Sequence, residues 1–178
     1  MTLRNGPDSY GLVSRILHWT MAAAILGMLG FGTWLARMEP RIDTIWLYGA
    51  HKSTGMVLFA MVLVRLAWHR VSPPPAPLPA PRWKTVAARA SHALVYLLLA
   101  AVPLTGWIAS AATGLDVVVF GRWTLPRIAP VSEAWENGFL AAHGLLTKAL
   151  LGLLVIHVGA ALTRRDGTLA RMSRGRAA

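Results

Sequence analysis

Four of the chain's six histidines are spaced so that they form two pairs, each of which could bind one metal-containing group. His143 and His157 are 14 residues apart, which on an α-helix is about four turns and ~21 Å of rise, so they share a face at two depths. Measured from the ends of their apolar stretches, His18 (~9 Å) matches the depth of His157 (~8 Å), and His51 (~6 Å) matches that of His143 (~8 Å). Pairing by depth therefore predicts two histidine pairs, His18 with His157 and His51 with His143.

The ligand chemistry of these pairs favours haem. Two neutral imidazoles leave four positions around an iron for the porphyrin nitrogens of haem b, whereas a bare metal ion would need more protein ligands. The chain has no cysteine, which excludes thiolate zinc sites, ordinary iron–sulfur clusters and covalent haem attachment. The sequence therefore predicts two non-covalent haem b groups with the four histidines as axial ligands. The alternative is that these histidines only form hydrogen bonds inside a helix bundle.

The other two histidines are less informative. His69 lies at the end of an apolar stretch beside Trp68 and Arg70, where a surface histidine is expected. His92 lies close in depth to His18 and His157. A spare ligand, a hydrogen-bond partner for quinone, a proton relay and a structural role all fit its position.

The elements that carry the histidines are long apolar stretches. Of 178 residues, 55% are hydrophobic and 14% charged, too apolar a composition for an ordinary soluble domain. Four stretches are long enough to cross a bilayer as helices: about residues 12–35, 47–69, 90–112 and 138–162. The first exceeds a usual signal-peptide core, and no convincing small-residue cleavage site precedes Arg37. We expect an all-α integral membrane four-helix bundle, with residues 1–178 as a single domain.

The segments between these stretches have their own signals. Residues 72–81 contain six prolines, which fix φ and remove hydrogen-bond donors, so we expect a stiff extended connector. Pro103 and Gly106 predict a kink or a close backbone approach within the third span. Residues 117–120 are apolar but too short to cross a membrane and are expected at its interface. Residues 163–178 are expected to form a basic, solvated tail.

The net charge of +11 indicates topology. Four spans put both termini on one side. That side holds twelve basic residues: Arg4, Arg15, Arg65, Arg70, Arg82, Lys84, Arg89, Arg164, Arg165, Arg171, Arg174 and Arg176. The other side holds five, namely Arg37, Arg41, Lys52, Arg122 and Arg127, and Lys148 lies inside the fourth span. By the positive-inside rule, both termini, the connector and the tail are cytoplasmic. The charge therefore requires no nucleic-acid partner.

Several short motifs follow one another in the order found in one family. They are Arg15-Ile16-Leu17-His18-Trp19, His51-Lys52-Ser53-Thr54-Gly55, Val64-Arg65-Leu66, the proline connector, Ser91-His92-Ala93-Leu94-Val95-Tyr96, Pro103-Leu104-Thr105-Gly106, and His143 with His157. From Tyr10 to about Leu162 the chain resembles the bacterial cytochrome b561 and nickel-hydrogenase cytochrome b family of four-helix dihaem membrane proteins. The resemblance implies that His18 and His157 bind the inner haem and that His51 and His143 bind the outer haem.

The resemblance also implies a reaction. The short branch with a proline connector is similar to superoxide oxidase, which takes electrons from superoxide at the outer face and passes them through two haems to ubiquinone. On this hypothesis the chain is a superoxide:ubiquinone oxidoreductase of the bacterial inner membrane. Longer relatives are cytochrome subunits of hydrogenases and formate dehydrogenases, so the alternative is an electron-carrier subunit with a periplasmic redox partner protein. A transporter or metal carrier that uses the same histidines without haem is a further alternative.

Further residues take roles on this hypothesis. Six-coordinate iron leaves no open position, so no side chain is expected to make or break bonds. Arg65 is expected to pair with an inner haem propionate. Lys52 and Lys148 either face the outer haem edge or an anion, or extend to the membrane interface. A basic cluster at the inner end either holds quinone or binds lipid headgroups: Arg82, Lys84, Arg89 and His92. The outer loops carry five basic and five acidic residues, so their net charge does not attract superoxide.

Overall fold

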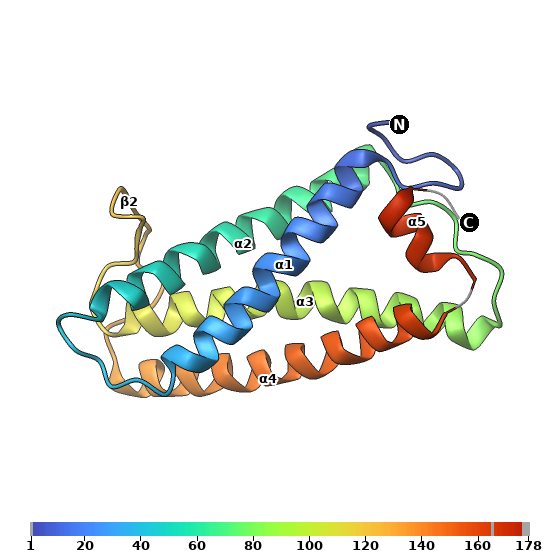
Figure 1. Ribbon diagram of the computed structural model, residues 1–178. Coiled ribbons are helices and arrows are strands. Elements are labelled where there is room, and N and C mark those ends of the chain that lie inside the picture. Colours follow the sequence, from blue (N-terminus) through green and yellow to red (C-terminus); the bar gives the residue numbers. More distant parts are fainter. Residues whose placement is uncertain (1, 165, 176–178) are drawn as a thin grey trace.

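The computed structural model describes residues 2–164 and 166–175. Four long helices lie side by side in an elongated bundle, with a small hairpin at one end and a short fifth helix at the other (Figure 1). The elements are α1 (Leu12–Leu35), α2 (Ile45–Val71), α3 (Arg82–Ala112), β1 (Val118–Val119), β2 (Trp123–Thr124), α4 (Glu133–Thr163) and α5 (Thr168–Arg174).

The four long helices have the length and composition of membrane spans. They contain 24 to 31 residues and apolar windows with mean hydropathy of 1.3 to 2.0. At 1.5 Å per residue they are ~36–46 Å long, longer than the ~30 Å hydrocarbon layer of a bilayer. Large apolar side chains cover their outer surfaces, for example Leu97, Leu145 and Val155. A soluble protein would bury such a surface, whereas lipid solvates it.

Two helices begin earlier than the apolar stretches predict. α3 starts at Arg82, directly after the last proline of the connector, and α4 starts at Glu133. The Ser132 side chain accepts a hydrogen bond from the Trp135 backbone N–H, and Glu133 and Glu136 lie in the first turn, where carboxylates favour the helix N-terminus. Capping therefore extends α4 through polar residues that hydropathy alone assigns to a loop.

The helices pack in the order α1 on α2, α2 on α3, and α3 along α4. The buried core consists of Met21, Ile25, Val62, Leu98 and Leu150. On α1 the core follows His18, and on α4 Leu150 lies midway between the two histidines of that helix. This apolar layer therefore separates the two predicted levels of histidines.

The segment expected at the membrane interface is a β-hairpin. Val118 pairs with Thr124 and Val119 with Trp123, in antiparallel register. Phe120 and Gly121 have positive φ in the turn, as a tight hairpin requires. The Phe120 backbone N–H donates to the Ser53 hydroxyl (2.9 Å), which attaches the hairpin to α2. The hairpin thus covers the end of the bundle opposite the N-terminal segment (Figure 1).

The tail predicted to be solvated is only partly exposed in its described part. Residues 168–174 form α5, and Arg171 is buried. Its guanidinium donates to the backbone carbonyls of Asp8 and Ala76, both at 2.9 Å. Hydrophilic composition suggested solvent exposure, but these carbonyls of the N-terminal segment and the connector need donors and Arg171 provides them. Three segments distant in sequence therefore meet at one end of the bundle.

The start of α5 is held by a carboxylate. Asp166 accepts hydrogen bonds from the Thr168 backbone N–H (3.1 Å) and hydroxyl (2.6 Å), and Arg164 donates to its other oxygen. Hydrogen bonding from the Arg164 side chain, helped by Thr168, lowers the pKa of Asp166 to about 2. The carboxylate is therefore ionised at neutral pH and caps the helix.

Candidate functional site

The structure brings together the histidines that the depth argument pairs. The ring centres of His51 on α2 and His143 on α4 are 6.2 Å apart, and those of His18 on α1 and His157 on α4 are 6.5 Å apart. An imidazole nitrogen binds a first-row metal at about 2 Å and lies about 1 Å from its ring centre, so two rings on opposite sides of one ion have centres about 6 Å apart. Both separations fit a metal ion between the rings.

The donor set suits a group that brings its own ligands. Among residues 2–164 and 166–175, no group of three or more histidine or acidic side chains is placed to hold a bare metal ion. A pair of imidazoles on opposite sides of a metal leaves a plane to be filled, and a porphyrin fills it with four nitrogens. The histidine pairs therefore fit haem better than zinc or manganese.

Glycines let two helices approach the rings of the outer pair, His51 and His143. A Cβ atom on Gly32 of α1 would lie 2.8 Å from His51 Cε1, and one on Gly106 of α3 would lie 3.1 Å from His143 Nδ1. The sequence predicts a close approach at Gly106. Nothing in the sequence distinguishes Gly32 from the chain's other glycines, because its importance comes from the neighbouring helix.

Hydrogen bonding orients one ring of the outer pair. His143 Nδ1 lies 2.8 Å from the Val102 carbonyl oxygen. The carbonyl only accepts, so Nδ1 carries the proton and Nε2 is free to bind a metal. His51 Nδ1 is buried and has no hydrogen-bond partner in the described part of the chain. A buried ring nitrogen without a hydrogen-bond partner is unfavourable, so this ring is less firmly oriented by the protein than that of His143.

Arg65 lies against the inner pair, His18 and His157. Its Nη2 atom is 3.0 Å from His18 Nδ1. Because a guanidinium only donates, Nδ1 accepts and the ring proton lies on Nε2. Binding of a metal through Nε2 therefore requires Arg65 to release this hydrogen bond and to find another acceptor. The guanidinium carbon also lies 5.9 Å from the centre of the Tyr96 ring, which holds Arg65 at the inner level.

His92 joins the inner level from α3. Its ring centre is 5.3 Å from that of His157, so three helices each contribute a histidine there. Arg89 lies one turn away from His92, but Arg82 is ten residues away, which is ~15 Å along the helix, and Lys84 is eight residues away, ~12 Å. The structure thus places Arg89 near His92 but spreads the rest of the predicted cluster along α3.

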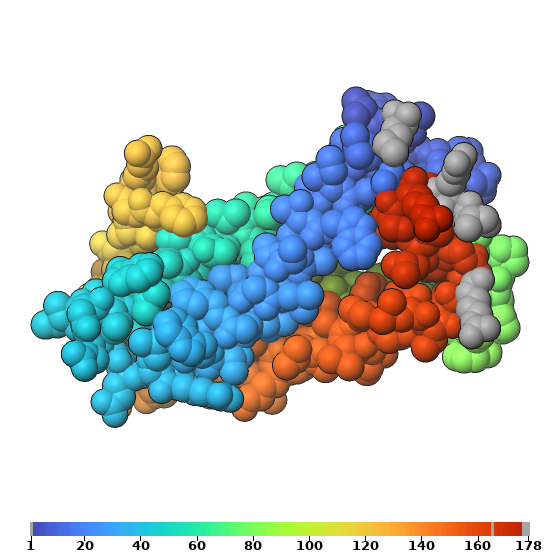
Figure 2. Space-filling model, viewed as in Figure 1, coloured from blue at the N-terminus to red at the C-terminus, as the bar shows by residue number. Residues whose placement is uncertain are grey.

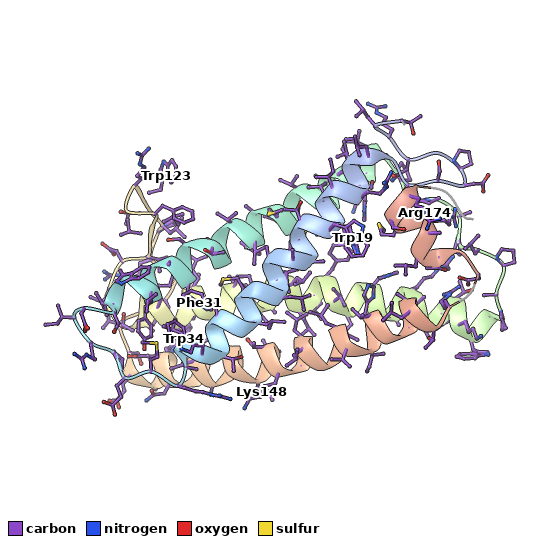
Figure 3. The ribbon with its side chains drawn as sticks, viewed as in Figure 1. Trp19, Phe31, Trp34, Trp123, Lys148 and Arg174 are labelled. Carbon is purple, nitrogen blue, oxygen red and sulfur yellow. The ribbon has the colours of Figure 1, made fainter. Side chains whose placement is uncertain are left out.

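The two lysines expected at the outer level have different surroundings. Lys52 follows His51 on α2 and is half-buried. Lys148 is exposed on α4 and projects away from the other helices (Figure 3). It is about 140° around the helix from His143 and about 180° from His157. The structure therefore does not bring Lys148 to the outer histidine pair.

Sequence comparison with known proteins identifies the family of this chain. Residues 9–175 match the sequence pattern of the family described as prokaryotic cytochrome b561. The chain belongs to this family. Cytochrome b561 homolog 2 of Escherichia coli (strain K12) is 34% identical over 180 aligned residues, which cover 97% of this chain and 95% of that relative. Cytochrome b561 homolog 1 of the same strain is 32% identical over 68% of this chain and 72% of its own. A protein of Yersinia pestis named probable superoxide oxidase CybB is 25% identical over 88% of this chain and 90% of its own.

As a cytochrome b561, the chain is a multi-pass membrane protein of haem-containing electron transport. The family assignment and the four long apolar helices agree. The resemblance seen in the motifs is therefore confirmed at the level of the family.

In this cytochrome b561, one set of contacts near the inner histidine pair is not predicted by the sequence. Trp19 lies edge-to-face on His18, with ring centres 5.1 Å apart, and its indole N–H donates to the Met172 carbonyl of α5 at 3.2 Å. Trp19 projects from α1 toward α5 (Figure 3). The surface is hollowed between α1, α4 and α5 (Figure 2). The tail was expected to be solvated, so nothing in the sequence linked it to the histidines.

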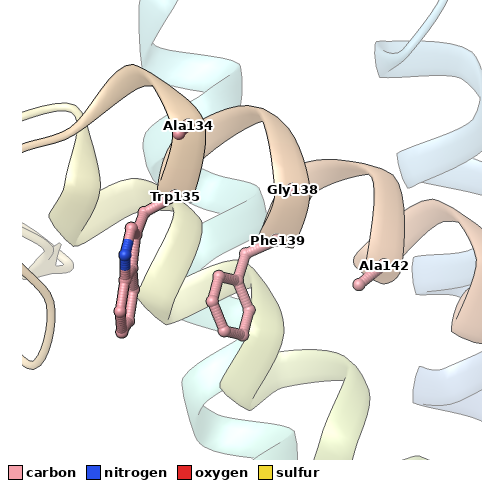
Figure 4. A pocket seen from close by; sticks show the side chains of 5 residues that line it. All are labelled: Ala134, Trp135, Gly138, Phe139 and Ala142. Carbon is pink, nitrogen blue, oxygen red and sulfur yellow. The ribbon is translucent and has the colours of Figure 1, made fainter.

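A groove of about 350 Å³ lies apart from both histidine pairs. It follows the first turns of α4 and is lined by Ala134, Trp135, Gly138, Phe139 and Ala142 (Figure 4). The rings of Trp135 and Phe139 lie side by side in it, 5.4 Å apart. Its lining has no titratable group, so it offers a contact surface rather than a reactive site.

Proposed function

We propose that this cytochrome b561 binds two haem b groups, with His18 and His157 as axial ligands of the inner haem and His51 and His143 as ligands of the outer haem. The observation that carries the proposal is the spacing of the ring centres, 6.5 and 6.2 Å, at two levels of one bundle. When bound, haem supplies a reversible one-electron couple at iron. The residues of the chain supply position, protonation state and exclusion of water.

Each group of residues has a defined task. The Val102 carbonyl keeps the proton of His143 on Nδ1 and so presents Nε2. Gly32 and Gly106 leave room beside the outer rings. The buried core around Val62 excludes water between the two levels. With haem bound, Arg65 would exchange its hydrogen bond to His18 for one to a propionate and would neutralise that carboxylate in an apolar surrounding.

We propose that the end with the termini and the connector is cytoplasmic and the hairpin end periplasmic, because twelve basic residues lie on the first side and five on the second. Superoxide is oxidised at the hairpin end and ubiquinone is reduced at the connector end. Two superoxide ions, one ubiquinone and two protons yield two molecules of dioxygen and one ubiquinol. His92 and Arg89, near the inner level, hydrogen-bond the quinone, and the His92 imidazole delivers protons to it. The name of the Yersinia relative supports this choice of donor.

A second candidate function keeps the same haem sites and changes the donor. The outer loops carry equal numbers of basic and acidic residues, so they create no net positive potential to attract superoxide. A relative with higher identity is named only as a cytochrome b561 homolog. In this case the chain is the electron-carrier subunit of a periplasmic dehydrogenase or hydrogenase, and the partner protein provides the electrons.

Replacing one ligand at a time tests the haem assignment. We expect the purified chain to contain two haems, and His51→Leu or His143→Leu to leave the inner haem only. His18→Leu and His157→Leu should leave the outer haem only. The measurements are haem per chain and the reduced-minus-oxidised spectrum. His69→Leu, which removes a histidine from neither pair, is the control and should retain both haems. Loss of the same haem in the His18 and His143 variants would contradict the pairing.

A second experiment separates the two candidate donors. Protein with both haems is placed in ubiquinone-containing vesicles and supplied with enzymatically generated superoxide. We expect ubiquinol formation that superoxide dismutase abolishes. Absence of ubiquinol, together with a second polypeptide that co-purifies and restores quinone reduction with its own substrate, would favour the electron-carrier subunit.

A further inference from the structure

The outward face of α4 carries a positive charge in the middle of the membrane. Lys148 is 15 residues from each end of α4, or ~22 Å along the helix in either direction. It lies opposite the side that carries the histidines and projects away from the bundle (Figure 3). A lysine exposed to hydrocarbon at this depth is strongly unfavourable and normally has an anionic or polar partner.

Residues 2–164 and 166–175 provide no such partner. All seven acidic side chains lie outside the apolar stretches: Asp8, Glu39, Asp43, Asp116, Glu133, Glu136 and Asp166. The nearest along α4, Glu136, is twelve residues away, or ~18 Å. Within the described ranges, the salt bridges join Arg41 to Asp43, Arg127 to Asp116 and Arg164 to Asp166. Lipid headgroups begin ~15 Å from the membrane centre, beyond the reach of one lysine side chain.

The surface around Lys148 is shaped for another helix. Gly144 and Gly152 lie one turn before and one turn after it on the same face, and a Cβ atom at either position would meet nothing within 4 Å. Small residues at such positions let a second helix backbone approach closely. Leu145 and Val155, 69% and 65% exposed, border this face and would pack against the partner. α4 packs on α3, whereas Lys148, Gly152 and Val155 on this face are exposed.

We propose that a transmembrane helix of a second protein docks on this face of α4 and places an Asp or Glu beside Lys148. The charge of Lys148 selects the occupant, because only a carboxylate at mid-depth neutralises it. A second copy of this chain does not suit the face: copies insert in the same orientation, so Lys148 would meet Lys148, with no carboxylate at that depth. The inference rests on the membrane helices and holds for either electron donor.

Photo-cross-linking in the native membrane tests the docking. A photoreactive amino acid at Leu145 should give one adduct heavier than the 19.2 kDa chain. We expect Lys148→Met to lower the yield of that adduct about tenfold, and Lys148→Arg, which keeps the charge, to retain it. The matched control is the same photoreactive residue at Leu97, which is exposed and lies at the midpoint of α3. It should not give this adduct.

Identification of the adduct and a charge exchange complete the test. Mass spectrometry should find a partner with an Asp or Glu near the centre of a transmembrane helix. Changing that carboxylate to Lys should abolish the adduct, and combining the change with Lys148→Glu should restore it. An adduct of two copies, a partner without such a carboxylate, no adduct, or a yield unchanged by Lys148→Met would each overturn the proposal. All variants should retain their haem content, so this outcome is independent of the haem assignment. Lys148→Gln replaces Lys148→Met if that variant does not accumulate.

Discussion

At the scale of single residues, the outer histidines have room for their rings because the neighbouring helices carry glycines, which have no side chain. Gly32 faces His51 across the α1–α2 contact, and a methyl group there would lie 2.8 Å from the ring. A ring without a ligand would turn aside at little cost. A ring held by a metal has a fixed orientation, so the same methyl group would strain the metal–ligand bond or displace the helix.

This argument gives a prediction for Gly32→Ala. We expect the variant to lose the outer haem, or to bind it with a shifted potential, while the inner haem stays unchanged. The measurements are haem per chain and a redox titration. Gly27→Ala is the matched control, because it lies on the same helix and its new methyl group would meet no atom within 4 Å. Identical haem content and potentials in the two variants would contradict the prediction.

At the scale of elements, α5 is the helix whose structure is least predictable from its amino-acid composition. Seven residues are too few for a stable isolated helix. Tertiary contacts stabilise it: Arg171 donates to two carbonyls of other segments, and the Tyr10 backbone N–H donates to the Gly175 carbonyl (2.9 Å). Through Trp19, which contacts both Met172 and His18, α5 also reaches the inner histidine level.

Removing the buried guanidinium should therefore loosen α5. Arg171→Met leaves the Asp8 and Ala76 carbonyls without a donor, which costs about 1–3 kcal/mol. We expect backbone amides of residues 168–174 to exchange with deuterium about tenfold faster or more, with the haem content unchanged. Hydrogen-exchange mass spectrometry in lipid nanodiscs measures this. Arg174→Met removes an exposed arginine from the same helix and should have no such effect. Equal exchange in both variants would show that Arg171 does not hold α5.

At the scale of the whole molecule, the bundle has two unlike ends. One end combines the N-terminal segment, the proline connector and α5, and carries most of the basic residues. The other carries the hairpin, which is tied to α2 through Ser53. A histidine pair lies toward each end, and the buried core separates the pairs. Such an arrangement suits transfer of electrons from one face of a membrane to the other.

The sidedness of these ends is directly testable, because the chain has no cysteine of its own. We expect Arg122→Cys, in the hairpin turn, to react with a membrane-impermeant maleimide in intact spheroplasts. Arg174→Cys, at the end of α5, should react only after lysis. Both positions are exposed, so a difference in labelling reports the side of the membrane and not burial. The cysteine-free chain is the control, and labelling of Arg174→Cys in intact spheroplasts would reverse the orientation.

Much of this protein could be predicted from sequence because two of its regularities are simple. Apolar runs of membrane length specify helices whatever their neighbours, and a fixed rise of 1.5 Å per residue converts sequence position into depth. Those two facts are enough to pair His18 with His157 and His51 with His143, and the structure brings the same residues together. The motifs around the histidines were also sufficient to recognise the family.

The tertiary structure alone decided which side of each helix contacts which neighbour. It placed Gly32 against His51, Arg65 against His18, and Arg171 under two distant carbonyls. It also turned Lys148 outward, away from the other helices (Figure 3). Depth is a property of one helix and can be counted along the chain. Rotation about the helix axis and contact between segments come from packing of the whole bundle, which no local pattern in the sequence encodes.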